Sequence, residues 1–457
     1  MKGESVMVQI NKDEDDNTVG LLGNYNDDEF EKEYESLQKR VNSNDDEDSE
    51  VEILTVDVEN EESQGLLAES STLGSPSNSS SSTNSSTHIL NPSPKKERQY
   101  WIDALRILAS YMVVLVHSSS YAIFEVPIFT LNWYGLMFWD AMSRTCVPLF
   151  VMISGILFLN PEKEITVSKI FKKYISRIVK TLIFWNAFYG TVVKYQVNAF
   201  KTEYKFTVDI IPDFFNDVIY GKFHMWYLYM CIGLYMITPL LRPITKDKRA
   251  LKYFVILSMT VVQVLPFVVN IINHFKGKSK FNIISDVLGK LALYFVGGYS
   301  CLYVLGYYLS CVEIKSKFML FIMYIGGLLL LLFTYGIKMV LSILHQKEIT
   351  DYGDYNALNV SLTAIIIFLF FKHTGSKIIN KLIRVRFFKF LLLKISQLSF
   401  GIYLIHVFYF ELFFRLKFHS YTFTSFIFSP IHAFIIWMCS LLTVSVLQYI
   451  PYVKDFL

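Results

Sequence analysis

From residue 100 onward the chain consists largely of apolar stretches, most of them about long enough to cross a lipid bilayer. A membrane-spanning helix needs about 20 predominantly apolar residues. Such segments must be helical, because no water in the hydrocarbon region satisfies backbone N–H and C=O groups. We therefore predict an all-α membrane protein with about ten transmembrane helices, at 101–123, 133–158, 170–194, 223–241, 251–272, 288–310, 318–342, 357–373, 397–415 and 426–449. The limits of the third and eighth segments are indistinct, which leaves nine or eleven crossings as alternatives.

The first 96 residues differ in kind from the rest. They hold 22 acidic and 7 basic residues, whereas the remainder holds 18 acidic and 36 basic ones. Runs of like charge such as NDDEFEKEYE, followed by a Ser/Asn/Pro tract, offer almost nothing to bury. We predict a disordered cytoplasmic tail at 1–96 and one multi-pass domain at 97–457. The tail has no apolar signal-peptide core, so the first span is expected to act as the signal.

The basic residues of the domain gather in alternate loops. Lysines and arginines are frequent around 163–173, 242–252 and 372–394. Cytoplasmic loops are rich in Lys and Arg, so this pattern predicts that both termini are cytoplasmic. Three lysines at 276–280 fall on the predicted outer side and disagree. Because these basic residues lie between the spans, we interpret them as signals of membrane topology and not as a nucleic-acid-binding surface. Nothing in the sequence indicates the organelle.

The five cysteines lie in or at the edges of apolar segments and form no CxxC pair. We predict that they are packing residues, with no disulfide framework and no metal site.

The first apolar segment, ALRILASYMVVLVH, contains Arg106 and His117. Eleven residues advance a helix by about 1100°, so the two lie on one face, roughly 16 Å apart along the axis. Both are costly in hydrocarbon, which indicates a shared polar cavity. Acyl-coenzyme A would suit this spacing, with phosphate at the arginine and the thioester near a histidine that takes a proton from a hydroxyl. Alternatively, Arg106 extends to the interface and His117 bonds a backbone carbonyl.

Arg144 follows Asp140 by four residues inside the second segment, a spacing that allows an ion pair on one helical face. Arg144 is either half of a structural pair or a residue that binds the donor or stabilises an oxyanion. Pro148 is expected to bend this segment. Asp103 is expected to cap the first helix or, alternatively, to position Arg106.

Three polar or aromatic residues, His224, Trp226 and Tyr227, open the fourth segment at its predicted outer end. They are either an interfacial aromatic belt or the lining of an acceptor site. Arg242, at the inner end, is either a positive-inside anchor or a ligand for coenzyme phosphates.

In the ninth segment Tyr403 and His406 share a face, and either a structural or a site-lining role is open for His406. Glu411 lies about 140° from His406 around the helix, so the two do not pair. Glu411 could instead orient another histidine or bind a cation. We expect Asp140, Tyr403 and Glu411 to line the site.

Four stretches together resemble the acyltransferase-3 family of integral membrane acyltransferases. They are RQYWIDALRILASYMVVLVH (98–117), SRTCVPLFVMISGILFL (143–159), HMWYLYMCIGLYMITPLLRPI (224–244) and LSFGIYLIHVFYFELF (398–413). The family has Arg or Lys, ten residues, then His, which corresponds to Arg106 and His117. The set is most similar to the branch that O-acetylates bacterial surface polysaccharides such as enterobacterial common antigen.

The resemblance implies an enzyme that moves an acyl group, expected to be acetyl, from cytoplasmic acetyl-CoA to a hydroxyl of a glycan or lipid-linked sugar. Acetyl-CoA would be a co-substrate, with no bound cofactor. His117 and Arg144 would be catalytic, and Arg106 and Arg242 would bind the donor. The competing classes are a transporter or channel with an intramembrane His/Arg pathway, which the lack of an inverted repeat disfavours, and a receptor-like scaffold.

Overall fold

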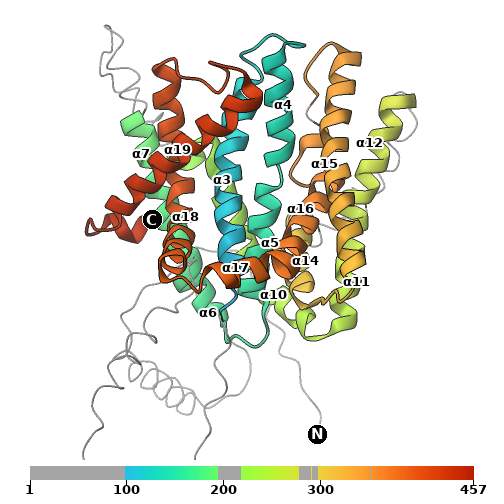
Figure 1. Ribbon diagram of the computed structural model, residues 1–457. Coiled ribbons are helices and arrows are strands. Elements are labelled where there is room, and N and C mark those ends of the chain that lie inside the picture. Colours follow the sequence, from blue (N-terminus) through green and yellow to red (C-terminus); the bar gives the residue numbers. More distant parts are fainter. Residues whose placement is uncertain (1–97, 194–217, 277–289, 291–296, 350) are drawn as a thin grey trace, which may run out of the picture. The chain divides into compact units, whose positions relative to one another are not determined.

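The structure is a computed structural model that describes residues 98–193, 218–276, 290, 297–349 and 351–457. These residues form helices joined by loops, and the described part of the chain contains no strand (Figure 1). The acidic tail predicted at 1–96 lies outside the described residues.

The helices follow one another along the chain, with short 3-10 and π-helical turns labelled η. They are α3 (Tyr100–Ala122), α4 (Leu131–Ser143), α5 (Cys146–Leu159), α6 (Val167–Lys169), η1 (Ile170–Ile175), α7 (Ser176–Phe188), η2 (Tyr189–Val193), η3 (Phe223–Met225), α10 (Trp226–Lys246), α11 (Lys248–Met259), η4 (Thr260–Val264), α12 (Leu265–Lys276), α14 (Ser300–Cys311), α15 (Lys317–His345), η5 (Asp351–Gly353), α16 (Leu358–Phe370), η6 (Phe371–Gly375), α17 (Ser376–Leu382), α18 (Arg386–Arg415), α19 (Ser425–Leu447) and η7 (Val453–Phe456).

Eight helical stretches among the described residues are long and apolar enough to cross a membrane, which confirms the all-α membrane fold. They are Tyr100–Ala122, Leu131–Leu159, Phe223–Lys246, Lys248–Ile272, Lys317–His345, Leu358–Leu382, Arg386–Arg415 and Ser425–Leu447. Two expected segments are not among them. The segment 170–194 is helical over 167–193, but its first half carries several basic residues, which lower its hydropathy. The segment 288–310 is described only in part, and its helix α14 has 12 residues.

Helix α3 lies among other helices, in contact with α4, α5, α18 and α19 (Figure 1). Its apolar side chains are buried on several sides, among them Leu105, Ala109 and Val114. A helix that is apolar all round is an interior helix. The first helix of the domain, which carries Arg106 and His117, is therefore shielded from lipid.

Helix α15 shows the opposite pattern. It exposes a band of large apolar side chains, Phe318, Phe321, Ile322, Ile325, Leu328, Leu329 and Leu332. An exposed apolar surface of this kind is what a lipid-facing helix presents.

The second span is broken into α4 and α5 at Arg144 and Thr145. Pro148 lacks an N–H, and its ring would clash with the carbonyl of Arg144, four residues earlier, if the helix continued. The bend predicted from Pro148 is thus present as an interruption, and it places Arg144 at the junction of two helices.

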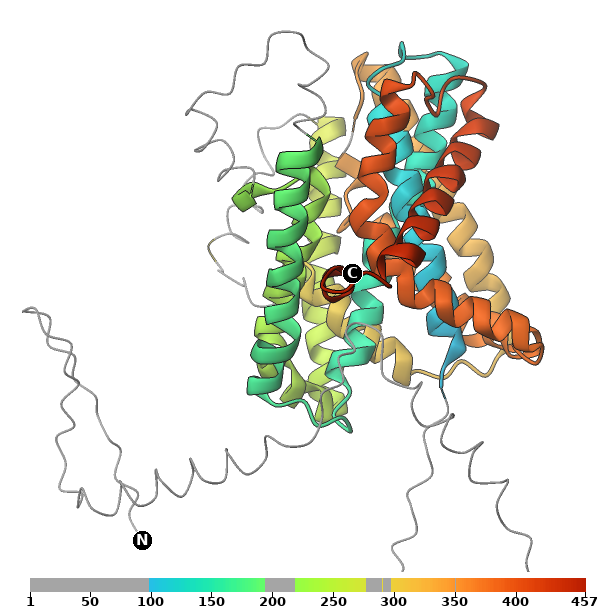
Figure 2. The same cartoon turned by 90° about the vertical axis from the view of Figure 1, so that its left-hand side faces the viewer.

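The last described turn, η7, packs against α7 (Figure 2). The Arg177 guanidinium and the Trp185 indole donate hydrogen bonds to the backbone carbonyls of Leu457 and Phe456, the second at 2.9 Å. The rings of Phe456 and Phe184 stack with centroids 4.6 Å apart. These contacts fix the final residues beside the interior helices.

Helices α5 and α14 cross so closely that only glycine fits at the crossing. A Cβ at Gly306 would lie 2.2 Å from the Met152 carbonyl oxygen, and one at Gly155 would lie 1.9 Å from that of Tyr303. Small residues at such crossings let the two backbones touch.

We predict that Gly306→Ala lowers the stability of the protein by about 1–3 kcal/mol, because the added methyl group forces the two backbones apart. Thermal unfolding in detergent measures this. Gly336→Ala in α15 is the matched control, since a Cβ there meets nothing within 4 Å. Equal unfolding temperatures for the two variants would contradict the close crossing.

Candidate active site

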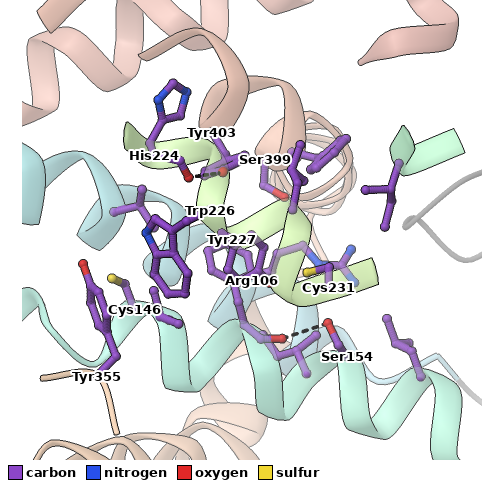
Figure 3. Close-up of a pocket in the computed structure, with 18 of the residues that line it drawn as sticks. Arg106, Cys146, Ser154, His224, Trp226, Tyr227, Cys231, Tyr355, Ser399 and Tyr403 are labelled. Carbon is purple, nitrogen blue, oxygen red and sulfur yellow. Dashed lines mark hydrogen bonds between the residues drawn. The ribbon is translucent and has the colours of Figure 1, made fainter. Parts of the chain in front are cut away.

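One cavity contains both Arg106 and His117, with walls from α3, α5, α7, α10 and α18. It encloses about 1070 Å³ of empty space, part of it open to solvent. The cavity is also lined by four residues proposed from the sequence as possible site-lining residues, His224, Trp226, Tyr227 and Tyr403 (Figure 3). The structure therefore brings together six of the expected residues, while their roles stay predictions.

Arg106 is buried at the end of this cavity nearer the start of α3. Its Nη1 donates to the Ser396 hydroxyl at 3.4 Å, and that hydroxyl donates to Asp103 at 2.8 Å. Arg98 binds the same carboxylate at 3.1 Å. The carboxylate of Asp103 is thus bound directly by Arg98 and linked to Arg106 through Ser396, and the two guanidinium groups leave this cluster with net positive charge. Asp103 makes no helix-capping bond, so the expected cap is wrong, because Arg98 and Ser396 occupy its oxygens.

A second cavity, of about 1370 Å³ with open solvent included, adjoins the first. Arg106 and Leu157 line both cavities, and Arg98 and Lys163 line the second one. A route on which three basic residues outnumber the acidic Asp103 and Glu162 therefore runs from the beginning of α3 to Arg106, and this arrangement attracts an anionic ligand.

His117 lies further along the cavity and is half-buried. Its ring stacks on that of His406, with centroids 5.3 Å apart and planes at 25°. The edge of Phe223 lies 5.2 Å from it, centroid to centroid. His224 in turn lies 5.3 Å from His406. Ring packing on both sides holds the His117 imidazole in one orientation.

Aromatic side chains form part of the cavity wall beyond His117. The Tyr403 hydroxyl donates to the backbone carbonyl of His224 at 2.6 Å, which ties α18 to the start of α10 (Figure 3). Trp226 stacks on Tyr355, with centroids 5.7 Å apart. Tyr355 comes from the loop before α16 and carried no sequence signal.

Asp140 is fully buried and is bound by two cations. Arg144 Nε donates to it at 2.9 Å, so the predicted i, i+4 pair is present. Lys338 Nζ, from α15, binds its other oxygen at 2.5 Å and is fully buried as well. The Ser120 hydroxyl of α3 donates to Asp140 at 2.6 Å and accepts from Arg144 at 2.8 Å. Lys338 was not predicted as a site residue, although a lysine within an apolar span is itself a signal.

Arg144 is not among the residues that line the cavity. Its guanidinium lies over the ring of Tyr355, at 5.4 Å from the centroid, and Tyr355 does line the cavity. The Tyr355 ring therefore lies between Arg144 and the cavity.

A second carboxylate, Glu348, lies near the same cluster, in the loop after α15. It accepts a hydrogen bond from the Trp133 indole at 3.3 Å. Burial raises the pKa of Glu348, although the positive charge of Lys338 lowers it.

Four residues predicted from the sequence to line the site or bind the donor are not among the residues that line the cavity: Asp140, Arg242, His406 and Glu411. Arg242 donates to the backbone carbonyls of Phe158, at 2.6 Å, and of Lys163, so it fastens the loop after α5. Glu411 forms an ion pair with Lys222.

A protein-family model described as an acyltransferase domain, of the acyltransferase-3 type, matches residues 99–450. The chain belongs to this family. It is thus a multi-pass membrane acyltransferase, and the likeness seen in the four motifs is confirmed at the level of the family. No curated protein and no solved structure shows a significant match to the acyltransferase. The described residues hold no group of three or more His, Cys, Asp or Glu suited to a metal ion.

We predict that Asp140→Asn destabilises the acyltransferase by about 3–5 kcal/mol, because it leaves Lys338 and Arg144 buried without a counter-charge. Adding Lys338→Met to Asp140→Asn should recover part of the loss, since one unpaired cation is removed. A double-mutant cycle on unfolding midpoints measures this coupling. Additive losses from the two substitutions would contradict the pairing.

Proposed function

We propose that the protein transfers an acetyl group from cytoplasmic acetyl-CoA to a hydroxyl of a glycan or lipid-linked sugar. The observation that carries the proposal is the shared cavity of Arg106 and His117, which adjoins a second cavity lined by basic side chains. Two adjoining cavities of this kind suit a donor that has an anionic head, a long arm and a reactive end.

The basic end of the route suits the phosphates of the donor. Arg98, Arg106 and Lys163 line it, and the acidic Asp103 and Glu162, which line it as well, offset part of their charge. Within the described residues Arg106 has one hydrogen-bond partner, the Ser396 hydroxyl, so most of its five N–H groups are available to a ligand. Guanidinium groups bind phosphate in fork geometry. Arg242, by contrast, contributes by fixing the loop that carries Lys163.

His117 suits the reactive end, roughly 16 Å along α3 from Arg106. A neutral imidazole takes the proton of the acceptor hydroxyl while the oxygen attacks the thioester carbonyl. The C–S bond then breaks, and the proton passes from His117 to the departing thiolate of CoA. Arg144, over the Tyr355 ring, places positive charge near the developing oxyanion. In a second form of this mechanism, His117 itself carries the acyl group transiently before the acceptor hydroxyl takes it.

The acceptor is expected at the His117 end. Basic loops assign the start of α3 to the cytoplasm, so His117 lies beyond mid-membrane, toward the outer face. Aromatic rings of Trp226, Tyr227 and Tyr403 line this part and suit the apolar faces of a sugar ring. The resemblance to the branch that O-acetylates surface polysaccharides supports the same acceptor class.

We predict that His117→Ala abolishes acyl transfer while expression and donor binding persist, because the variant loses the group that moves the proton. The loss expected for a general base is about 10²- to 10⁴-fold. Purified protein in detergent, incubated with radiolabelled acetyl-CoA, reports both CoA release and bound donor.

His345→Ala is the matched control, since His345 is exposed at the end of α15, away from the cavity. Activity that survives His117→Ala would refute the mechanism. Absence of acyl-CoA binding by the wild type, together with transport of a solute, would favour the transporter class instead.

A further inference from the structure

Tyr355 is the side chain that separates the charge of Arg144 from the cavity. Arg144 is not among the residues that line the cavity, whereas Tyr355 lines it and carries the Arg144 guanidinium over its ring. The oxyanion of an acyl-transfer intermediate is stabilised best by donors that contact the oxygen itself. Arg144 needs a group in front of it to make that contact, and Tyr355 has a hydroxyl to offer.

The loop that carries Tyr355 is held in place by buried polar contacts. The Asn359 side-chain amide donates to the backbone carbonyl of Tyr352 at 2.9 Å. Lys338 packs against Gly353, where an added Cβ would lie 3.3 Å from its Nζ atom. These contacts fix the chain on both sides of Tyr355, so its phenol is positioned before any ligand binds.

Two neighbours hold the Tyr355 ring itself. The Arg144 guanidinium lies 5.4 Å from the ring centroid, and the Trp226 indole stacks on the ring with centroids 5.7 Å apart (Figure 3). Arg144 is also close enough to His117 for its charge to act on that imidazole. The ring that Arg144 contacts therefore lies at the reactive end of the cavity, where the thioester is expected.

The Tyr355 hydroxyl forms no hydrogen bond with any residue that the structure describes. Other buried tyrosines of the fold do form one. The Tyr189 hydroxyl donates to the Leu404 carbonyl at 2.7 Å, and the Tyr303 hydroxyl pairs with that of Thr238 at 2.9 Å. An O–H group that the fold leaves available at a cavity wall can donate to an oxygen of a ligand.

The phenol of Tyr355 is suited to donate a hydrogen bond and to keep its proton. Burial raises the pKa of Tyr355, and the charge of Arg144 lowers it by a smaller amount, so the hydroxyl is protonated at neutral pH. A nearby cation favours negative charge on the phenol oxygen, which makes the O–H group a stronger donor.

We infer that Tyr355 donates a hydrogen bond to the carbonyl oxygen of the thioester and holds it more tightly as that oxygen gains negative charge. This inference rests on the proposed function and names the group that contacts its oxyanion. His117 takes the proton of the acceptor hydroxyl, the C–S bond breaks, and the electron pair leaves with the CoA sulfur. Tyr355 keeps its proton throughout. Arg144 is then a positioning residue that orients the ring and strengthens its donor.

The first arm of the test is infrared difference spectroscopy on the full chain in detergent, with acetyl-CoA that carries carbon-13 at the thioester carbonyl. The C=O stretch of bound acetyl-CoA should lie at a lower frequency than that of free acetyl-CoA, because a hydrogen bond weakens the double bond. Tyr355→Phe keeps the ring and removes only the hydroxyl. This variant should still bind acetyl-CoA, but the frequency should return toward the value of the free thioester.

Tyr299→Phe is the matched control for this arm. Tyr299 packs on the same Trp226 indole, with centroids 5.7 Å apart, but it is not among the residues that line the cavity. Its variant loses a hydroxyl beside the same stack of rings and should keep the wild-type carbonyl frequency.

The second arm measures turnover and stability, with methyl β-D-glucopyranoside as the acceptor probe. Tyr355→Phe should lower kcat about 10²- to 10³-fold, as expected for loss of one oxyanion donor. Its KM for acetyl-CoA should change little, because the bond strengthens mainly in the transition state. Its unfolding temperature should equal that of the wild type, since the hydroxyl bonds to nothing in the described part of the chain.

The possible failures are distinguishable. A wild type that binds acetyl-CoA without a shift in its carbonyl frequency overturns the inference, and so does a shift that survives in Tyr355→Phe. Unchanged kcat in that variant does the same. If the wild type does not acetylate the glucoside, the infrared arm decides. A wild type that binds no acetyl-CoA refutes the proposed function itself, and this result precedes any comparison of variants.

Discussion

The ion pairs of Asp140 hold together the part of the fold on which the cavity depends. A lone charge in the interior of a membrane protein is costly, so Asp140, Lys338 and Arg144 are each tolerated only in the presence of the others. Their bonds join α4 to α15, and Ser120 adds α3. Arg144 lies at the junction between α4 and α5. Its guanidinium binds Asp140 and also lies over the ring of Tyr355, which lines the cavity.

The two ends of the cavity differ in the kind of polar group that they contain. At the Arg106 end, two arginines lie near one aspartate, which leaves net positive charge for an anion to balance. At the His117 end the lining side chains are imidazole and aromatic rings. The first end therefore attracts an anion and the second suits an uncharged group, in agreement with the donor and the acceptor proposed above.

Much of the fold and part of the site follow from the sequence, because length, apolar content and helical spacing are local properties. They predicted the helical spans, the Asp140–Arg144 pair and the face shared by Arg106 and His117. Lys338 and Tyr355 were missed, since their partners are distant in the chain and only tertiary packing brings them to Asp140 and Arg144. The cap expected of Asp103 was wrong for a similar reason: its partner Ser396 lies in α18.

The central claim is that the donor extends from Arg106 to His117 inside one cavity. The most direct measurement is a cryo-EM structure of the full chain with coenzyme A bound. The account predicts phosphate density at Arg98 and Arg106, and the sulfur within hydrogen-bonding reach of the His117 imidazole. Coenzyme A bound elsewhere, or with its sulfur directed away from His117, would contradict it.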